Sequence, residues 1–200
     1  MLIILICLVC FLIGAIPNGY ILAKKLYNID IRTQGSGNIG STNMRRILNN
    51  KVSVLTQVLD ILKGLIPTVV VAMYLMSTTA YSDETKSLIL CAAALCTVLG
   101  HDYTPFLGFN GGKGVNTTLG AFFLLSPFSV IIGVLLYFVL KPVTEIVFLR
   151  SIALGASLVI TSFMFVPNTY VIGLSFVLFL LLLIRHKKNF RDYFREKKNK

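Results

Sequence analysis

The sequence predicts an all-α integral membrane protein with about seven transmembrane helices, several of them short, an external N-terminus and a cytoplasmic C-terminus. Three observations support this fold class. The 200 residues are 56% hydrophobic, and only 14% are charged, with a mean hydropathy of +0.80, far from an ordinary soluble composition. The apolar residues form long runs. The basic residues gather in short connectors and the tail, as the positive-inside rule expects.

Seven apolar runs are the candidate membrane passes, although several are shorter than the roughly 20 residues that cross a bilayer upright. Lys24 after the first run and the basic end of the chain should both be cytoplasmic, which requires an odd number of passes. Ser126-Pro127 divides one region into two short helices, and a five-pass arrangement with these as a re-entrant pair stays open. The runs are Leu2–Ala23, Val54–Met76, Leu88–Leu99, Val115–Leu125, Phe128–Leu140, Ile146–Phe165 and Tyr170–Ile184.

We expect one membrane-embedded domain over residues 1–200, with a basic cytoplasmic tail at 185–200, because no linker or low-complexity block divides the chain. No internal repeat is evident, which weakly disfavours a secondary transporter. The excess of 19 Lys and Arg over 8 Asp and Glu could suggest nucleic acid, but few of these residues would be free to form a continuous basic patch. We therefore expect a lipid bilayer and no nucleic acid as partner.

A glycine-rich loop between Asp30 and Arg46 follows the first run. Glycines let successive backbone N–H groups converge on one anion, and Ser41 or Thr42 can cap a short helix whose N-terminus would favour an anion. The loop predicts a phosphate cradle, and an ordinary polar loop with positive-inside arginines is the alternative. Its donors are Arg32, Ser36, Gly37, Asn38, Thr42, Asn43, Arg45 and Arg46.

A second glycine-rich loop surrounds Lys113, with Gly111, Gly112 and Gly114 beside it. It fails the nucleotide P-loop test, because that motif needs Ser or Thr after the lysine and a glycine where Leu107 stands. An ATPase is therefore disfavoured, but a lone phosphate could sit on the backbone and the lysine. A plain helix-linking turn is the alternative.

Two further pairs of polar residues interrupt or end apolar runs. Asp60 and Lys63 lie at helical spacing inside the second run, where charges face a partner or a site, and we favour mutual neutralisation. His186 and Asn189 close the last run and would share one helical face if that helix continues. The basic residues around them are routine at the end of a membrane pass.

Several other sites are not predicted. Cys7, Cys10, Cys91 and Cys96 all lie in apolar runs and are interpreted as small buried hydrophobes. No metal or other cofactor is expected, because no His, Cys and carboxylate set has convincing ligand spacing. No Gly-x-Ser-x-Gly elbow or His-Glu-x-x-His motif occurs, and neither histidine has an aspartate at the His-x4-Asp spacing.

The loops carry a resemblance that spans nearly the whole chain. The sequence resembles the bacterial membrane family of acyl-phosphate:glycerol-3-phosphate acyltransferases, the PlsY family. The motifs that carry it are specific in this order: Gly14-Ala15-Ile16-Pro17-x-Gly19-Tyr20, Gly35-Ser36-Gly37-Asn38-x-Gly40-x-Thr42-Asn43, Leu59-Asp60-Ile61-Leu62-Lys63-Gly64, Gly100-His101, Phe109-x-Gly111-Gly112-Lys113-Gly114-Val115 and Arg185-His186-x-x-Asn189.

The resemblance implies a seven-helix enzyme of the bacterial cytoplasmic membrane that makes lysophosphatidic acid from acyl phosphate and glycerol 3-phosphate without a metal. It implies that the Gly111–Gly114 backbone holds phosphate, that Asp60, Lys63 and His101 support the site, and that the site is lined by Ser36, Arg46, Lys113, His186 and Asn189. Acyl-chain preference, oligomeric state and direct binding of the enzyme that makes acyl phosphate stay open.

This sequence departs from the family pattern at Asn18, Asn116, Ala153 and the stretch Phe190-Arg191-Asp192. These departures bear on substrate preference and rate more than on reaction class. A transporter for organic phosphate would use the same cationic loops and is the rival interpretation.

Overall fold

The computed structural model describes residues 1–198, and these contain helices and no strand, which confirms the all-α prediction. The chain forms two compact units, Met1–Leu125 and a second that begins at Ser126. The prediction of a single domain stays a prediction, and Asn199 and Lys200, the end of the predicted tail, lie outside the described residues.

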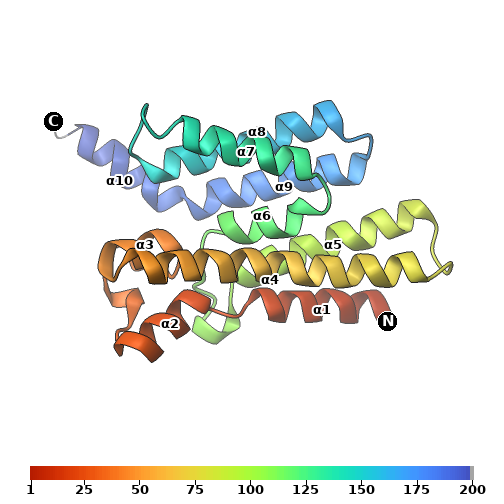
Figure 1. The fold of residues 1–200 in the computed structure, drawn as a ribbon, viewed down its shortest axis with the longest axis horizontal. Helices are drawn as coiled ribbons and strands as arrows, with labels where there is room; N and C mark the ends of the chain where they lie inside the picture. The colour runs from red at the N-terminus through yellow and green to blue at the C-terminus, as the bar shows by residue number, and fades with distance from the viewer. Residues whose placement is uncertain (199–200) are drawn as a thin grey trace. The chain divides into compact units, whose positions relative to one another are not determined.

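The first unit contains six α-helices and two short 3₁₀ turns (Figure 1). The long helix α4 packs against α1, α5 and α6. Asn49 caps α4, its side chain accepting from the Val52 N–H at 3.0 Å, and Ser82 caps α5 in the same way. The helices are α1 (Leu2–Gly14), α2 (Asn18–Tyr27), α3 (Ser41–Ile47), α4 (Asn50–Ser77), α5 (Asp83–Asp102) and α6 (Val115–Phe123).

A break between α1 and α2, which the sequence analysis did not predict, interrupts the first apolar run. Pro17, which has no N–H to donate, directly precedes α2. The break frees backbone carbonyls in an apolar region, where they need internal partners. The Lys63 ammonium donates to the Ile16 carbonyl at 2.7 Å, and the Thr104 hydroxyl donates to the Ala15 carbonyl at 2.6 Å. The break is thus stabilised by side chains from distant parts of the chain.

Reciprocal glycines let two helix pairs of this unit approach backbone to backbone. A Cβ at Gly14 of α1 would collide with the Thr97 carbonyl of α5, and a Cβ at Gly100 of α5 would collide with the Phe11 carbonyl of α1. In the α4–α6 pair, Gly120 meets the Ile61 carbonyl in the same way. Small residues at such contacts are typical of helices that associate in membranes.

The second unit consists of three consecutive helices that pack in pairs and a basic terminal helix. Pro127 occupies the first turn of α7, which confirms the predicted division at Ser126-Pro127. Gly133 of α7 lies beside Leu154 and Ser157 of α8. The helices are α7 (Pro127–Val139), α8 (Val147–Phe165), α9 (Thr169–Arg185) and α10 (Lys187–Lys198).

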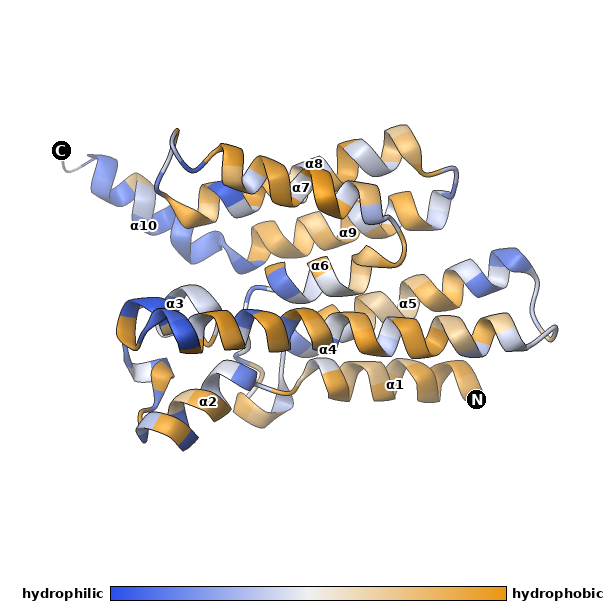
Figure 2. Cartoon of the chain, viewed as in Figure 1, coloured by the Kyte–Doolittle hydropathy of each residue, from blue (hydrophilic) through white to orange (hydrophobic). Residues whose placement is uncertain are grey.

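Four segments of the described chain are long and apolar enough to cross a membrane, and α9 with α10, which are bent by 50°, would make a fifth. Figure 2 shows apolar residues along α1, α4, α7 and α9 and hydrophilic ones concentrated in α10. The protein is therefore a multi-pass membrane protein, whereas the count of seven passes stays a prediction. The four segments are Leu2–Tyr27, Asn50–Ser77, Asp83–Leu107 and Val147–Phe165.

The close α4–α6 contact can be tested with one methyl group. Gly120→Ala places a Cβ against the Ile61 carbonyl, and such overpacking should destabilise the protein by about 1–3 kcal/mol. Thermal unfolding in detergent should show Tm falling by about 2–4 °C per kcal/mol.

The matched control is Gly173→Ala in α9, where a Cβ would meet nothing within 4 Å. Alanine is the better helix former by up to about 1 kcal/mol, so this variant should match or exceed the wild-type Tm. Equal Tm values for Gly120→Ala and the wild type would contradict the contact.

Candidate anion site on two glycine loops

The first loop is held in shape by the buried side chain of Asn43, which is 2% exposed. Its carboxamide oxygen accepts from the Ser36 N–H at 3.0 Å. Its amide nitrogen donates to the Gln34 carbonyl at 3.0 Å and towards the Ile31 carbonyl at 3.4 Å. Asn43 therefore closes the loop in this conformation and has little surface to offer a ligand.

The same loop needs glycine at two turns and leads into α3 without the expected side-chain cap. Gly35 and Gly37 have φ of 57° and 72°, conformations that glycine adopts without strain. The prediction that Ser41 or Thr42 caps α3 is wrong: Gly40 is the N-cap. The Asn38 side chain accepts from the Gly40 N–H at 2.9 Å and turns the chain into the helix one residue earlier.

The cations of the first loop have different surroundings. Arg32 forms an ion pair with Asp30 at 2.6 Å, and its guanidinium lies 4.8 Å from the centre of the Tyr20 ring. Hydrogen bonds from Arg32 lower the pKa of Asp30 to about 2. Arg45 and Arg46 are both exposed on α3, and neither has a hydrogen bond or ion pair with a described residue. These two are the cations of this loop that an anion could recruit.

The second loop folds back onto the end of α5. The Gly111 N–H donates to the Asp102 carbonyl at 3.2 Å, and the Gly112 N–H donates to the His101 carbonyl at 3.0 Å. A Cβ at Gly112 would collide with the His101 ring, so glycine is required for this approach. The Gly111 and Gly112 amides, which were predicted to hold phosphate, therefore form backbone hydrogen bonds that stabilise the loop in this conformation. Lys113 is half-exposed beside these amides, and Gly114, the next residue, is the N-cap of α6.

A side-chain hydrogen bond joins the two loops, 75 residues apart in sequence. The Asn116 amide donates to the Ser41 hydroxyl at 3.3 Å. Ser53 of α4 donates to the Ser41 carbonyl at 2.8 Å. The beginnings of α3 and α6 therefore meet at one place in the first unit. Asn116, a departure from the family pattern, is the residue that joins them, and its chemical role was missed by sequence analysis.

A buried charged network lies behind the second loop. The Lys63 ammonium lies 3.1 Å from an Asp60 oxygen, and the Asn18 amide donates to the same oxygen at 3.1 Å. His101 Nδ1 is 3.9 Å from it. The expected neutralisation of Asp60 by Lys63 is confirmed. Sequence analysis missed Asn18, although a polar residue directly after a proline inside an apolar run was an available signal.

His186 of the second unit is buried, 3% exposed, at the end of α9. Its Nδ1 lies 2.8 Å from the Leu182 carbonyl oxygen. Because a carbonyl only accepts, Nδ1 carries the hydrogen and Nε2 is the basic nitrogen of the neutral ring. Phe148 of α8 stacks on the ring at 6.4 Å between centroids. This carbonyl orients the ring in place of the carboxylate that is absent from the nearby sequence.

Asn189 follows His186 but on a different helix. The last apolar helix does not continue as one rod, because α9 ends at Arg185 and α10 begins at Lys187 with a bend of 50°. Asn189 is half-buried in the first turn of α10. Phe190, the next residue, packs edge-on against Phe148 at 5.1 Å, which anchors this turn within the second unit.

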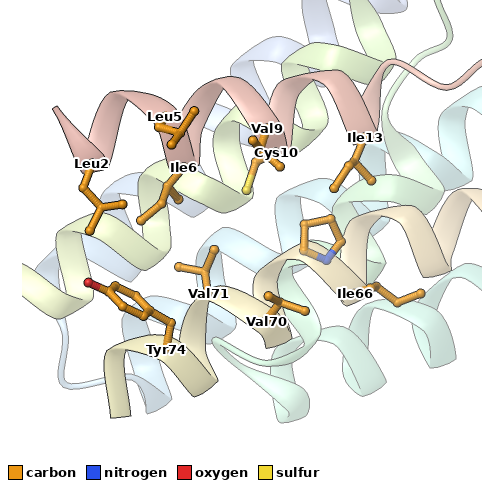
Figure 3. A pocket seen from close by; sticks show the side chains of 11 residues that line it. Leu2, Leu5, Ile6, Val9, Cys10, Ile13, Ile66, Val70, Val71 and Tyr74 are labelled. Carbon is orange, nitrogen blue, oxygen red and sulfur yellow. The ribbon is translucent and has the colours of Figure 1, made fainter. Parts of the chain in front are cut away.

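An apolar cavity of about 330 Å³ lies between α1 and α4 of the first unit. In Figure 3 the side chain of Ile6 on α1 faces that of Val71 on α4 across it. Several residues of its wall are exposed, as expected for side chains that contact lipid. The cavity offers room for a hydrocarbon chain. Its lining is Leu2, Leu5, Ile6, Val9, Cys10, Ile13, Ile66, Pro67, Val70, Val71 and Tyr74.

Within residues 1–198, no three His, Cys, Asp or Glu side chains converge in a way that could hold a metal ion. All four cysteines are free, with Cys10 and Cys91 buried.

Comparison with known proteins shows the family of this chain. The family model of glycerol-3-phosphate acyltransferase matches residues 4–196. The glycerol-3-phosphate acyltransferase of Clostridium acetobutylicum is 50% identical over 182 residues, which cover 91% of each chain. That of Endomicrobium trichonymphae is 38% identical over 197 residues, 98% of this chain and 94% of the relative.

Two solved structures are similar over the whole fold. PlsY, an integral membrane glycerol 3-phosphate acyltransferase, matches in its glycerol 3-phosphate form with a TM-score of 0.87 and 33% identity, covering 98% of this chain and 94% of that one. Its lysophosphatidic acid form matches with a TM-score of 0.85 and 32% identity, covering 98% and 93%. This membrane chain therefore belongs to the glycerol-3-phosphate acyltransferase family and is an acyltransferase of phospholipid biosynthesis.

Proposed function

We propose that this acyltransferase moves a fatty acyl group from acyl phosphate to the 1-hydroxyl of sn-glycerol 3-phosphate, forming lysophosphatidic acid and phosphate at the cytoplasmic face of a bacterial cell membrane. The observation that carries the proposal is the junction of the two glycine loops, where Asn116 contacts Ser41. Both substrates carry a terminal phosphate, which is a monoester in glycerol 3-phosphate and part of a mixed anhydride in acyl phosphate. A joined pair of loops with nearby cations suits such anions.

The proposed chemistry requires alignment more than activation. An acyl phosphate is already activated, so the enzyme must bring the hydroxyl to the carbonyl and stabilise the charge that develops. Alignment can lower a barrier by about 7–11 kcal/mol, and one well-placed donor by about 3–4 kcal/mol. Family membership favours this reaction over the organic-phosphate transporter that the cationic loops alone would also allow.

The proposed roles follow the resemblance residue by residue. Arg46 and Lys113 clamp phosphates, and Ser36 and Asn189 orient the acceptor. A phosphate oxygen of the donor or Nε2 of His186 takes the hydroxyl proton. The contact from Nδ1 to the Leu182 carbonyl supports the second alternative, because in the neutral ring it makes Nε2 the nitrogen that can accept a proton.

Donor choice tests the proposed reaction. Purified protein in detergent, where no gradient exists, should form lysophosphatidic acid from acyl phosphate and retain its rate in EDTA, because no metal-binding cluster occurs among the described residues. Acyl-CoA free of acyl phosphate should give no comparable turnover. Equal rates with both donors would contradict the donor assignment, and loss of activity in EDTA with recovery on one divalent ion would contradict the metal-free mechanism.

The adjacent arginines of α3 test the phosphate clamp. Neighbours on a helix point about 100° apart, so Arg45 and Arg46 should not both enter one small pocket. Arg46→Ala should lower kcat/KM for glycerol 3-phosphate by about 10²- to 10³-fold, because a bidentate phosphate contact is lost. Arg46→Lys should recover little, since lysine lacks the planar fork.

Arg45→Ala is the matched control and should stay near wild type, because losing a surface charge costs less than about 1 kcal/mol. The two variants are compared at equal membrane expression. If Arg45→Ala is the inactive variant, the assignment of phosphate binding to Arg46 is wrong by one residue.

The proposed topology has seven passes with an external N-terminus. Single cysteines introduced into a background without the native four should be labelled from the cytoplasm at Asn110, which is exposed in the second loop, and at Lys198, and from outside at Asp83, Glu84 and Asn168. Labelling of intact cells and inverted vesicles checks this. Labelling of Asn110 and Lys198 from opposite sides would overturn the topology, because the second glycine loop and the tail should share the cytoplasmic side.

A further inference from the structure

A buried arginine in the second unit has no acceptor for its hydrogen bonds. Arg150 of α8 is 7% exposed, and its Nε has no hydrogen-bond partner. Among residues 1–198 its side chain forms no ion pair or hydrogen bond, and its guanidinium lies 4.7 Å from the centre of the Tyr137 ring. Arginine stays charged at all ordinary pH, and an unpaired buried charge is costly. No side chain of the described residues therefore compensates this charge.

The start of α8 has no side-chain cap either. Ile146 is the N-cap and provides no side-chain cap. Within the described chain, no acceptor binds the N–H groups of Val147, Phe148 or Leu149. The open amides give this end of the helix a partial positive charge. Arg150, in the next position, adds a full positive charge where a cation is disfavoured.

The guanidinium and the open amides lie at the same end of the α7–α8 hairpin. Gly133 of α7 lies beside Leu154 of α8, and one turn nearer the connecting loop Tyr137 lies beside Arg150. Side chains of a helix tilt toward its N-terminus, which carries Arg150 toward the amides. Stacking on Tyr137 uses the face of the guanidinium, so the in-plane N–H groups still point outward for an acceptor.

Acidic residues of this unit do not supply the missing charge. Glu145, which precedes the helix, is exposed and forms no ion pair with Arg150. Asp192 lies 3.6 Å from Arg191. The three open amides and the fork of Arg150 make a donor set of the kind that binds a tetrahedral oxyanion.

We propose that Arg150 and the first turn of α8 form a binding site for a phosphate group. Two sources share this chemistry: a single-chain phosphate monoester, such as the lysophosphatidic acid product of the proposed reaction, and the headgroup of a bilayer phospholipid. The site itself does not depend on the proposed function, which bears only on the first source.

Hydrogen exchange read by mass spectrometry tests the site locally. The full chain in neutral maltoside detergent is compared with and without dodecyl phosphate at matched ionic strength. The amides of Val147, Phe148 and Leu149 should exchange about tenfold more slowly when the ligand is at ten times its Kd. Exchange of the proteolytic peptide that contains these three amides is also measured for the protein in nanodiscs of phosphatidylglycerol and in nanodiscs of phosphatidylcholine. Slower exchange of these amides with dodecyl phosphate identifies a single-chain phosphate monoester as the ligand. Slower exchange in the phosphatidylglycerol nanodiscs and under no other condition identifies a bilayer phospholipid as the ligand.

Arg150→Gln should abolish the ligand-dependent protection, and Arg150→Lys should retain part of it. Lys141→Gln is the matched control, because Lys141 is exposed in the turn before α8, and it should keep the wild-type response. If exchange of these amides in the wild-type protein is slowed neither by dodecyl phosphate nor in either kind of nanodisc, the proposal is overturned, whatever the variants show. Equal protection in Arg150→Gln would overturn it too. Protection of residues 108–118 in the same data reports on the proposed catalytic site separately.

Discussion

The buried ion pair between Asp60 and Lys63 is the interaction on which the first unit depends. A charge in an apolar helix is costly unless it is paired and hydrogen-bonded. Each member of this pair also reaches another segment: Lys63 donates to the Ile16 carbonyl at the break after α1, and Asp60 accepts from Asn18 at the start of α2. His101, beside Asp60, supports the glycine loop through its carbonyl and its ring. The Asp60–Lys63 pair therefore connects the segment before the first glycine loop, at the break between α1 and α2, with the end of α5 that supports the second glycine loop.

Glycine has two separate functions in this architecture. Within the helices, Gly14, Gly100 and Gly120 let backbones touch, which brings α5 and α6 close to α1 and α4. In the loops, Gly111 and Gly112 let the chain fold onto the end of α5. The donors left for an anion then lie at the helix starts that Asn116 and Ser41 join. The positions of the two glycine loops therefore depend on how closely the apolar helices pack.

The sequence was sufficient to predict the helical class, the break at Ser126-Pro127 and the two loops, because these follow from local composition and from proline chemistry. The break after α1, the cap at Gly40 and the contact from Asn116 to Ser41 were not predicted. The break after α1 and the cap at Gly40 depend on the side chains of Lys63 and Asn38. A sequence does not specify in which direction these side chains point. The last joins residues 75 positions apart, and such contacts arise only when whole helices are packed.

A double-mutant cycle of Asp60→Asn and Lys63→Met, read as thermal unfolding in detergent, tests the central role of the ion pair most directly. Each single change leaves the other group buried without its partner and should cost about 3–5 kcal/mol. The double variant leaves no unpaired charge, so its loss should be smaller than the sum of the single losses by more than about 1 kcal/mol. Additive losses would show that the two charges act independently and would contradict this account.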